Sequence, residues 1–236
     1  MHREYFHWPS RDLERDMELL VFGQAGTPTI VFPTSMGAFF EYEDRKMVEA
    51  LAPKIENGQL QLFCVSTIDA DSFYADQIHP RQRIERYLAW ERYLVGDVVP
   101  FIRQRNAGPI GVTGCSFGAY HAFTMALRHP DVFTSCTTMG GAFDLKRFLN
   151  GYSDLDAYLL SPPDFLPQLN DPWFLDRIRA NKWVFVTGEN DICRVQTEQA
   201  AAMLGAHGVS NSLHVWGHGS VHDWPEWTKM AAAYIP

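Results

Sequence analysis

Short apolar runs alternate with longer amphipathic stretches along the chain. Apolar runs of this length are typical of strands buried on both faces. They predict strands over Met17–Phe22, Thr29–Phe32, Leu60–Ser66, Ile110–Thr113, Ser135–Met139, Trp183–Thr187 and Asn211–Trp216. Strands that alternate with helices indicate βαβ units, so we expect an α/β protein with a mostly parallel central sheet flanked by helices.

The amphipathic stretches have the period of helices. They predict helices over Phe40–Ile55, Arg81–Arg105, Gly118–His129, Val195–Gly205 and Pro225–Tyr234. In the third of these, Tyr120, Phe123 and Leu127 share one face, and Pro130 ends the helix. We expect the second to be broken near Pro100, because proline removes a helical hydrogen bond.

The interval 145–181 breaks this pattern, since it is rich in Tyr, Phe, Trp, Pro and Asp. It is either a small helical and aromatic insertion over the mouth of the sheet, where pockets form, or a surface excursion packed on its own aromatics. The length of 236 residues fits one large α/β domain, so we predict a single domain over 1–236.

Composition and charge narrow the possible partners. Hydrophobic residues make up 46% of the chain and charged residues 20%, an ordinary globular balance. The net charge of −8, with no run of Lys or Arg, argues against a nucleic-acid partner. The polar N-terminus and the lack of any apolar stretch near ~20 residues predict a cytoplasmic protein with no membrane partner. The four cysteines lie far apart, which favours buried free thiols.

The pentapeptide Gly114-Cys115-Ser116-Phe117-Gly118 is the first candidate for chemistry. It has the pattern G-x-S-x-G, which places a serine at the apex of a tight strand-to-helix turn. The small flanking residues permit a strained backbone, and the helix dipole lies beneath the developing negative charge. Because a predicted strand precedes it and a predicted helix follows it, we assign Ser116 as a nucleophile.

A general base is expected in the loop after the last strand, where His218 and His222 both qualify. His214, His218 and His222 also share a four-residue spacing, which on a helix could hold zinc. The glycines between them oppose a helix, so we expect no metal site. From the residues alone, His218 and His222 remain nearly tied as the base.

The acid of a Ser–Asp–His triad follows the serine and precedes the histidine in this kind of fold. The strand Trp183–Thr187 runs into Gly188-Glu189-Asn190-Asp191. Asp191 is favoured over Glu189, because the turn must first clear the end of the strand. Asp144, after an earlier strand, is a more distant alternative.

Several segments resemble the branch of the α/β-hydrolases named after the "Putative esterase" family, which includes esterase D-like enzymes, enterochelin esterases and mycolyltransferases. The similar segments are Val98-Val99-Pro100-Phe101-Ile102, Arg128-His129-Pro130-Asp131-Val132-Phe133, Gly140-Gly141-Ala142-Phe143-Asp144 and His222-Asp223-Trp224-Pro225-Glu226-Trp227. The last resembles that branch's terminal H-x-W-x-x-W, and this resemblance implies His222 as the base. One departure is Pro33-Thr34, where the branch often has Asp-Gly before its oxyanion loop.

These residues together predict a serine carboxylester hydrolase that acts through Ser116, Asp191 and His222 and an acyl-enzyme. The oxyanion would be bound by the N–H groups of Phe117 and Ser35. The expected substrate is a small-molecule ester, and no metal or organic cofactor is required. The predicted pocket side chains are Met36, Phe73, Tyr74 and Trp224. An acyltransferase with the same triad and a catalytically dead hydrolase fold that only binds are the alternatives.

Overall fold

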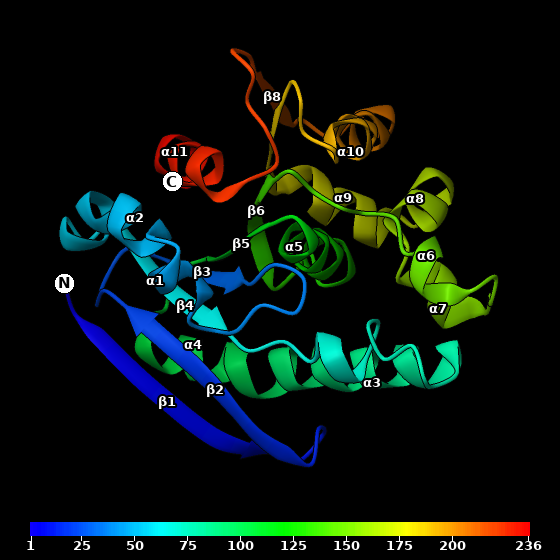
Figure 1. Cartoon of the computed structure of the whole chain (residues 1–236), viewed down its shortest axis with the longest axis horizontal. Coiled ribbons are helices and arrows are strands. Elements are labelled where there is room, and N and C mark those ends of the chain that lie inside the picture. The colour runs from blue at the N-terminus through cyan, green and yellow to red at the C-terminus, as the bar shows by residue number, and fades with distance from the viewer.

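A computed structural model describes residues 1–236, whose strands form one eight-stranded sheet (Figure 1). The strands are β1 (Arg3–Ser10), β2 (Arg15–Phe22), β3 (Thr27–Phe32), β4 (Leu60–Val65), β5 (Ile110–Cys115), β6 (Phe133–Met139), β7 (Lys182–Gly188) and β8 (Ser212–Trp216). Their spatial order is β1-β2-β4-β3-β5-β6-β7-β8. β2 is antiparallel to β1 and β4, and every other neighbouring pair is parallel. The predicted mostly parallel sheet is confirmed.

Helices cover both faces of this sheet. They are α1 (Glu41–Asp44), α2 (Met47–Glu56), α3 (Pro80–Tyr93), α4 (Val99–Arg105), α5 (Phe117–Arg128), α6 (Lys146–Leu149), α7 (Leu155–Leu159), α8 (Pro162–Phe165), α9 (Pro172–Ala180), α10 (Arg194–Ala206) and α11 (Trp224–Tyr234). Figure 1 shows α2 and α11 on one face, with α3, α4, α5, α9 and α10 on the other. Apolar side chains fill both layers, in a smaller core and a larger core respectively. None of the helices combines the length and apolar character that crossing a bilayer would require.

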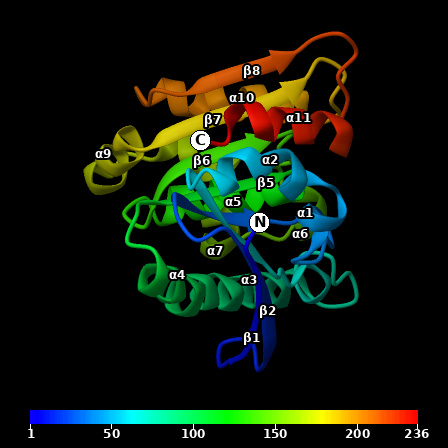
Figure 2. The ribbon, with the colours of Figure 1, turned by 90° about the vertical axis from the view of Figure 1, so that its left-hand side faces the viewer.

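The central strands lie where the sequence has its unbroken apolar runs. Every residue of β4 and β5 is buried, because helices cover both of their faces. The helix α5 is buried along its whole length from Phe117 to Leu127. In Figure 2 the arrows of β7 and β8 end at the same edge of the sheet. The loops that follow the parallel strands therefore meet at that edge, where ligands bind in folds of this kind.

The edge strand β1 is not predicted by the apolar pattern. Along Arg3–Ser10 the residues alternate between exposed and half-buried, with only Ser10 buried. Phe6 and Trp8 pack against Phe101 on one side, whereas Tyr5 and His7 are exposed on the other. A strand with one open face has no continuous apolar run, so the search for such runs does not find it.

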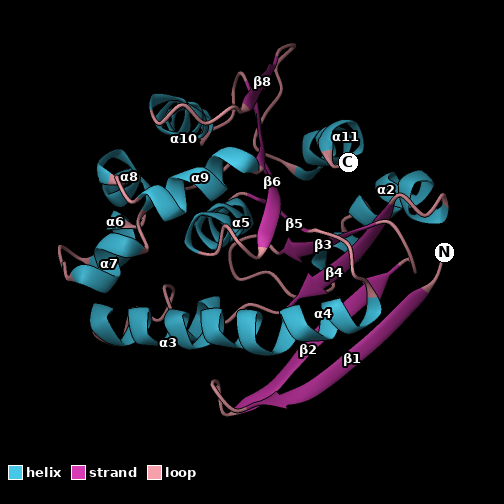
Figure 3. Ribbon diagram, turned by 180° about the vertical axis from the view of Figure 1, so that it is seen from behind, coloured by secondary structure: helices cyan, strands magenta, loops and turns pink.

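Two predicted helices differ from the structure. The helix over Phe40–Ile55 is divided into α1 and α2 at Lys46, which has a left-handed backbone with φ of 60°. The predicted break near Pro100 is wrong, since α3 continues into α4 as nearly one rod (Figure 3). A π-helical turn over Leu94–Val98 joins them, and Val99 N–H donates to Leu94 O. Pro100 is the second residue of α4, where a missing N–H is tolerated.

The interval 145–181 contains α6 to α9 and packs on the body of the protein. Its apolar side chains join the larger core, among them Phe148, Leu160 and Ile178. Arg81 of α3 also pairs with Asp154 and Asp156, both at 2.7 Å. The segment is therefore not packed on its own aromatics alone. Its helix α6 reaches the residues next to Ser116, because the Phe148 ring packs on that of Phe117.

Candidate active site

Ser116 lies in the turn between β5 and α5 with a strained backbone, at φ 54° and ψ −119°. A Cβ on Gly114 would lie 2.3 Å from the carbonyl of Gly118, and a Cβ on Gly118 would lie 2.4 Å from Phe32 O. Both glycines of the pentapeptide are therefore required by close backbone packing. Ser116 N–H donates to Met139 O at 2.9 Å, which ties the turn to the end of β6.

The structure brings Ser116, His222 and Asp191 into one hydrogen-bonded chain. His222 Nε2 lies 2.9 Å from Ser116 Oγ, and His222 Nδ1 lies 2.7 Å from Asp191 Oδ1. The three residues follow β5, β8 and β7, which is why one sheet edge collects them. The side chain of Asp191 has no exposed surface, while that of His222 keeps 15%. An ionised carboxylate favours the proton on Nδ1, which leaves the Nε2 lone pair for the hydroxyl proton.

The pKa of His222 is raised from its ordinary value of 6.5 to about 9. Burial of the imidazole lowers this pKa, but the hydrogen bond to Asp191 and the neighbouring Cys193 thiol together outweigh it. Cys193 N–H also donates to Asp191 Oδ1 at 2.7 Å, which fixes the carboxylate. The donor atoms of Asp191, Cys193 and His222 lie within 4.8 Å of one another, so this is the cluster that could hold a metal ion. Asp191 and His222 are, however, already paired with each other.

Gly140 and Trp227 both pack against the imidazole of His222. Gly140 has a positive φ of 56°, and a Cβ there would lie 2.5 Å from Asp191 Oδ2 and 3.0 Å from His222 Nδ1. Only glycine leaves room for the carboxylate and the imidazole at this point. The indole of Trp227 meets the His222 ring edge to face at 4.7 Å, so it limits the rotation of the imidazole.

The segment Thr34–Gly37, at the start of the loop after β3, has one N–H group without a partner. Its other N–H groups have partners: Thr34 N–H donates to Glu41 Oε2 at 2.7 Å, Met36 N–H donates to Asp69 Oδ2 at 3.0 Å, and Gly37 N–H donates to Thr34 O at 2.8 Å. Ser35 N–H makes no hydrogen bond within the protein. Across the Ser116 turn, Phe117 is the first residue of α5, where N–H groups lack partners within the helix.

A second carboxylate–imidazole pair lies beneath this loop. Asp69 Oδ1 is 3.2 Å from His121 Nε2, and both side chains are buried, with exposed fractions of 2% and 1%. His121 Nδ1 is 3.4 Å from the Tyr87 hydroxyl. Asp69 thus connects the loop after β3, through Met36 N–H, to α5. No sequence motif predicts this pair, and its one signal is a histidine on a helix that is otherwise largely apolar.

The four predicted pocket residues differ in how far their side chains are exposed. Met36 is 55% exposed, and the half-buried Tyr74 donates its hydroxyl to Ser35 Oγ at 2.6 Å. Trp224 is half-buried at the start of α11, and its ring meets that of Tyr42 edge to face at 5.8 Å between centres. Phe73 is fully buried among other aromatic rings. The prediction that Phe73 contacts substrate is therefore corrected: it packs in the core under Tyr74.

Two exposed apolar residues beside the site were not predicted. Ile192 is 82% exposed and follows Asp191 directly, while Val221 is 45% exposed and precedes His222. An apolar side chain that stays exposed in an otherwise polar loop is a signal of a binding surface when it adjoins reactive groups. Ile192 and Val221 therefore expose apolar side chains next in sequence to Asp191 and His222.

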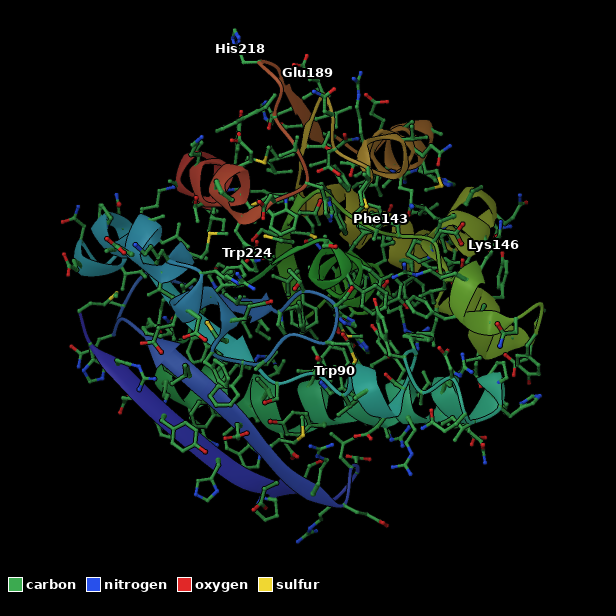
Figure 4. The ribbon with its side chains drawn as sticks, in the orientation of Figure 1. Trp90, Phe143, Lys146, Glu189, His218 and Trp224 are labelled. Atoms are coloured by element: carbon green, nitrogen blue, oxygen red, sulfur yellow. The ribbon has the colours of Figure 1, made fainter.

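None of the alternative acids and bases makes a hydrogen bond to Ser116 or His222. Glu189 and His218 are exposed at the tip of the loops after β7 and β8, far above Trp224 in Figure 4. The carboxylate of Glu189 accepts a hydrogen bond from Gly219 N–H, so it joins these two loops. Asp144 is exposed, and His214 stacks on Tyr234 at 4.2 Å between ring centres.

Comparisons with known proteins identify the family and the fold of this chain. The family model described as "Putative esterase" matches residues 45–234. A ferulic acid esterase has a similar structure, with a TM-score of 0.79 and 13% identity, covering 100% of this chain and 96% of that chain. An S-formylglutathione hydrolase from Agrobacterium tumefaciens gives a TM-score of 0.72 and 15% identity over 99% of this chain and 92% of that chain.

A third solved structure is a fluorophosphonate-binding serine hydrolase from Staphylococcus aureus. It has a TM-score of 0.67 and 17% identity, with coverage of 99% of this chain and 96% of that chain. None of the curated protein sequences matches this chain. The predicted α/β-hydrolase fold is confirmed by these structures, and the family model covers most of the sequence. The chain therefore belongs to the "Putative esterase" family and is an esterase of the α/β-hydrolase fold.

Proposed function

We propose that the protein is a serine carboxylester hydrolase in which Ser116 is the nucleophile, His222 the general base and Asp191 the residue that orients His222. The observation that carries the proposal is the hydrogen-bonded chain from Ser116 Oγ through both nitrogens of His222 to Asp191. This is the arrangement that activates a serine hydroxyl, because the imidazole takes its proton as the oxygen attacks. The strained turn at Ser116 supports the same role.

In the proposed reaction Ser116 Oγ attacks the ester carbonyl carbon and His222 Nε2 takes the hydroxyl proton. The negative oxygen that forms is bound by the N–H groups of Phe117 and Ser35, neither of which has a partner within the protein. The imidazolium then gives its proton to the leaving alcohol, and an acyl-enzyme remains. Water deprotonated by His222 releases the acid and restores Ser116.

We propose a small-molecule ester as the substrate. Met36, Tyr74 and Trp224 remain in the proposed pocket, and we add the exposed residues Ile192 and Val221 to it. Apolar side chains that stay exposed next to reactive groups favour a substrate with an apolar portion near the carbonyl. The chemistry requires neither a metal ion nor an organic cofactor.

Labelling with a fluorophosphonate tests this proposal, and the fluorophosphonate-binding serine hydrolase of Staphylococcus aureus suggests the reagent. We expect the intact mass of the folded protein to increase by one phosphonyl group. Ser116→Ala and His222→Ala should abolish both labelling and the hydrolysis of p-nitrophenyl acetate, with a loss of about 10⁴-fold or more.

Two exposed residues provide matched controls. Ser153→Ala and His218→Ala remove a serine and a histidine that do not contact Ser116, and both should label like the wild type. Labelling that persists in Ser116→Ala would overturn the assignment of the nucleophile. A folded wild type that neither labels nor hydrolyses the ester would favour the dead-hydrolase alternative.

A further inference from the structure

Arg147 of α6 is an exposed side chain that is ordered without an acidic partner. Its Nη2 donates to the Tyr74 hydroxyl at 2.9 Å. Its guanidinium lies 4.4 Å from the centre of the Phe148 ring and 5.8 Å from that of Tyr74. The neighbouring Lys146, labelled in Figure 4, instead pairs with Asp164 at 3.8 Å. Arg147 therefore presents a fixed and uncompensated positive charge.

Two sets of contacts place this charge beside the reaction centre. The Tyr74 hydroxyl donates to Ser35 Oγ at 2.6 Å, so Arg147 is two hydrogen bonds away from the loop that supplies a proposed oxyanion donor. The rings of Tyr74 and Phe148 also pack on Phe117, at 5.7 Å and 5.3 Å between centres. Phe117 follows the proposed nucleophile directly.

We propose that Arg147 binds a carboxylate carried by the substrate, so that the enzyme prefers anionic esters; this inference rests on the proposed function. A guanidinium has five N–H donors in a planar fork that matches a carboxylate, and Arg147 uses one of them on Tyr74. Stacking on Phe148 and Tyr74 holds the fork at the site before the substrate binds, so little side-chain freedom is lost.

The charge balance favours a single carboxylate over a phosphate dianion. A dianion would call for a second free cation, and the adjacent Lys146 is already paired with Asp164. The protein as a whole carries −8, so it repels anions at a distance. An anionic ester would therefore be selected by the local contact with Arg147, a charge-assisted bond worth about 10- to 100-fold in kcat/KM.

Matched esters test the preference through their release of alcohol. One pair places the charge on the acyl part, monoethyl glutarate against ethyl pentanoate, and the other places it on the alcohol part, carboxymethyl butyrate against ethyl butyrate. We expect the wild type to favour the carboxylate ester in at least one pair. Arg147→Gln should lower kcat/KM for that ester about 10- to 100-fold and change the neutral ester less than about twofold.

Variants and salt separate binding of the carboxylate from a structural role. Arg147→Lys keeps the charge without the fork and should retain part of the preference. Arg177→Gln is the matched control, because the half-buried Arg177 also stacks on an aromatic ring, the indole of Trp173 at 3.9 Å, and has no acidic partner. It should leave both members of each pair unchanged. Added salt should weaken the preference of the wild type.

The outcomes distinguish this inference from the proposed function. Equal kcat/KM for both members of each pair, or an equal loss for both in Arg147→Gln, would overturn the role of Arg147 while esterase activity stands. If the wild type releases alcohol from none of the four esters and does not react with a fluorophosphonate, the proposed function itself fails.

Discussion

Two of the carboxylate–imidazole pairs in the protein contact the segments around Ser116, one formed by His222 and Asp191 and the other by His121 and Asp69. In the first, His222 Nδ1 is 2.7 Å from Asp191, and Nε2 faces Ser116 Oγ. In the second, His121 Nε2 is 3.2 Å from Asp69, and the other ring nitrogen faces the Tyr87 hydroxyl. The same two chemical groups are therefore used in different surroundings.

The difference lies in what the second nitrogen meets. His222 keeps a partly exposed edge and one nitrogen directed at a hydroxyl that a substrate can reach. His121 is buried, with both nitrogens engaged inside the core. A pair of the first kind can move protons, whereas a pair of the second kind can only hold elements together. We expect substitutions in the two pairs to affect activity and stability in opposite proportions.

Asp191→Asn should have the largest effect on activity. It leaves the shape of the pair but removes the charge that fixes the Nδ1 proton, so kcat/KM should fall about 10³- to 10⁴-fold. Because the side chain remains, the Tm should change by only a few degrees. Steady-state hydrolysis and thermal unfolding measure the two. A variant that keeps more than about a tenth of the wild-type kcat/KM would contradict the role of Asp191.

The pH profile should show the next largest effect. His222 accepts a proton only when neutral, and its pKa is raised to about 9, so imidazolium accumulates as the pH falls below that value. The kcat/KM should therefore decrease about tenfold per pH unit below about pH 9. The sequence alone places this fall at the ordinary histidine range of about 6 to 7. A profile that stays flat from pH 9 down to pH 7 would count against the raised pKa.

Asp69→Ala should show the reverse balance, with a large effect on stability and a small effect on rate. It leaves His121 buried without its partner, which costs about 3 kcal/mol and lowers the Tm by about 6 to 12 °C. Met36 N–H also loses its acceptor, so kcat should fall about tenfold with little change in KM. Asp69→Asn keeps an acceptor for that N–H and should restore most of kcat. If Asp69→Ala loses as much rate as Asp191→Asn, the contrast between the pairs is wrong.

Most of the sheet could be predicted, because strands covered on both faces have unbroken apolar runs. The runs that predict β4 and β5 agree with the structure to within two residues. The strand β1 could not be found this way, since its open face interrupts the pattern. The junction of α3 and α4 could not be predicted either, because a π-helical turn depends on how the rod packs and not on a local residue preference. The single domain over 1–236 stays a prediction.

The candidate site likewise contains residues that the sequence predicts and residues that it does not. Ser116, Asp191 and His222 could be proposed because each follows a predicted strand in the order that this fold uses. Asp69 and His121 are separated by 52 positions and share no motif, so only the folded chain reveals their contact. Arg147 was missed for the same reason, since its partner Tyr74 lies 73 positions earlier. Phe73 and Tyr74 are neighbours in sequence, and the sequence does not tell which of them faces the core.

The backbone of Ser116 also decides which nucleophile this turn can present. A positive φ is a genuine strain for a β-branched side chain, whereas a small unbranched one tolerates it. Threonine offers the same hydroxyl group, yet its extra methyl is incompatible with this conformation. Cysteine has the right shape and would exchange oxygen for sulfur without moving the main chain. The turn thus selects serine over threonine by conformation and not by reactivity.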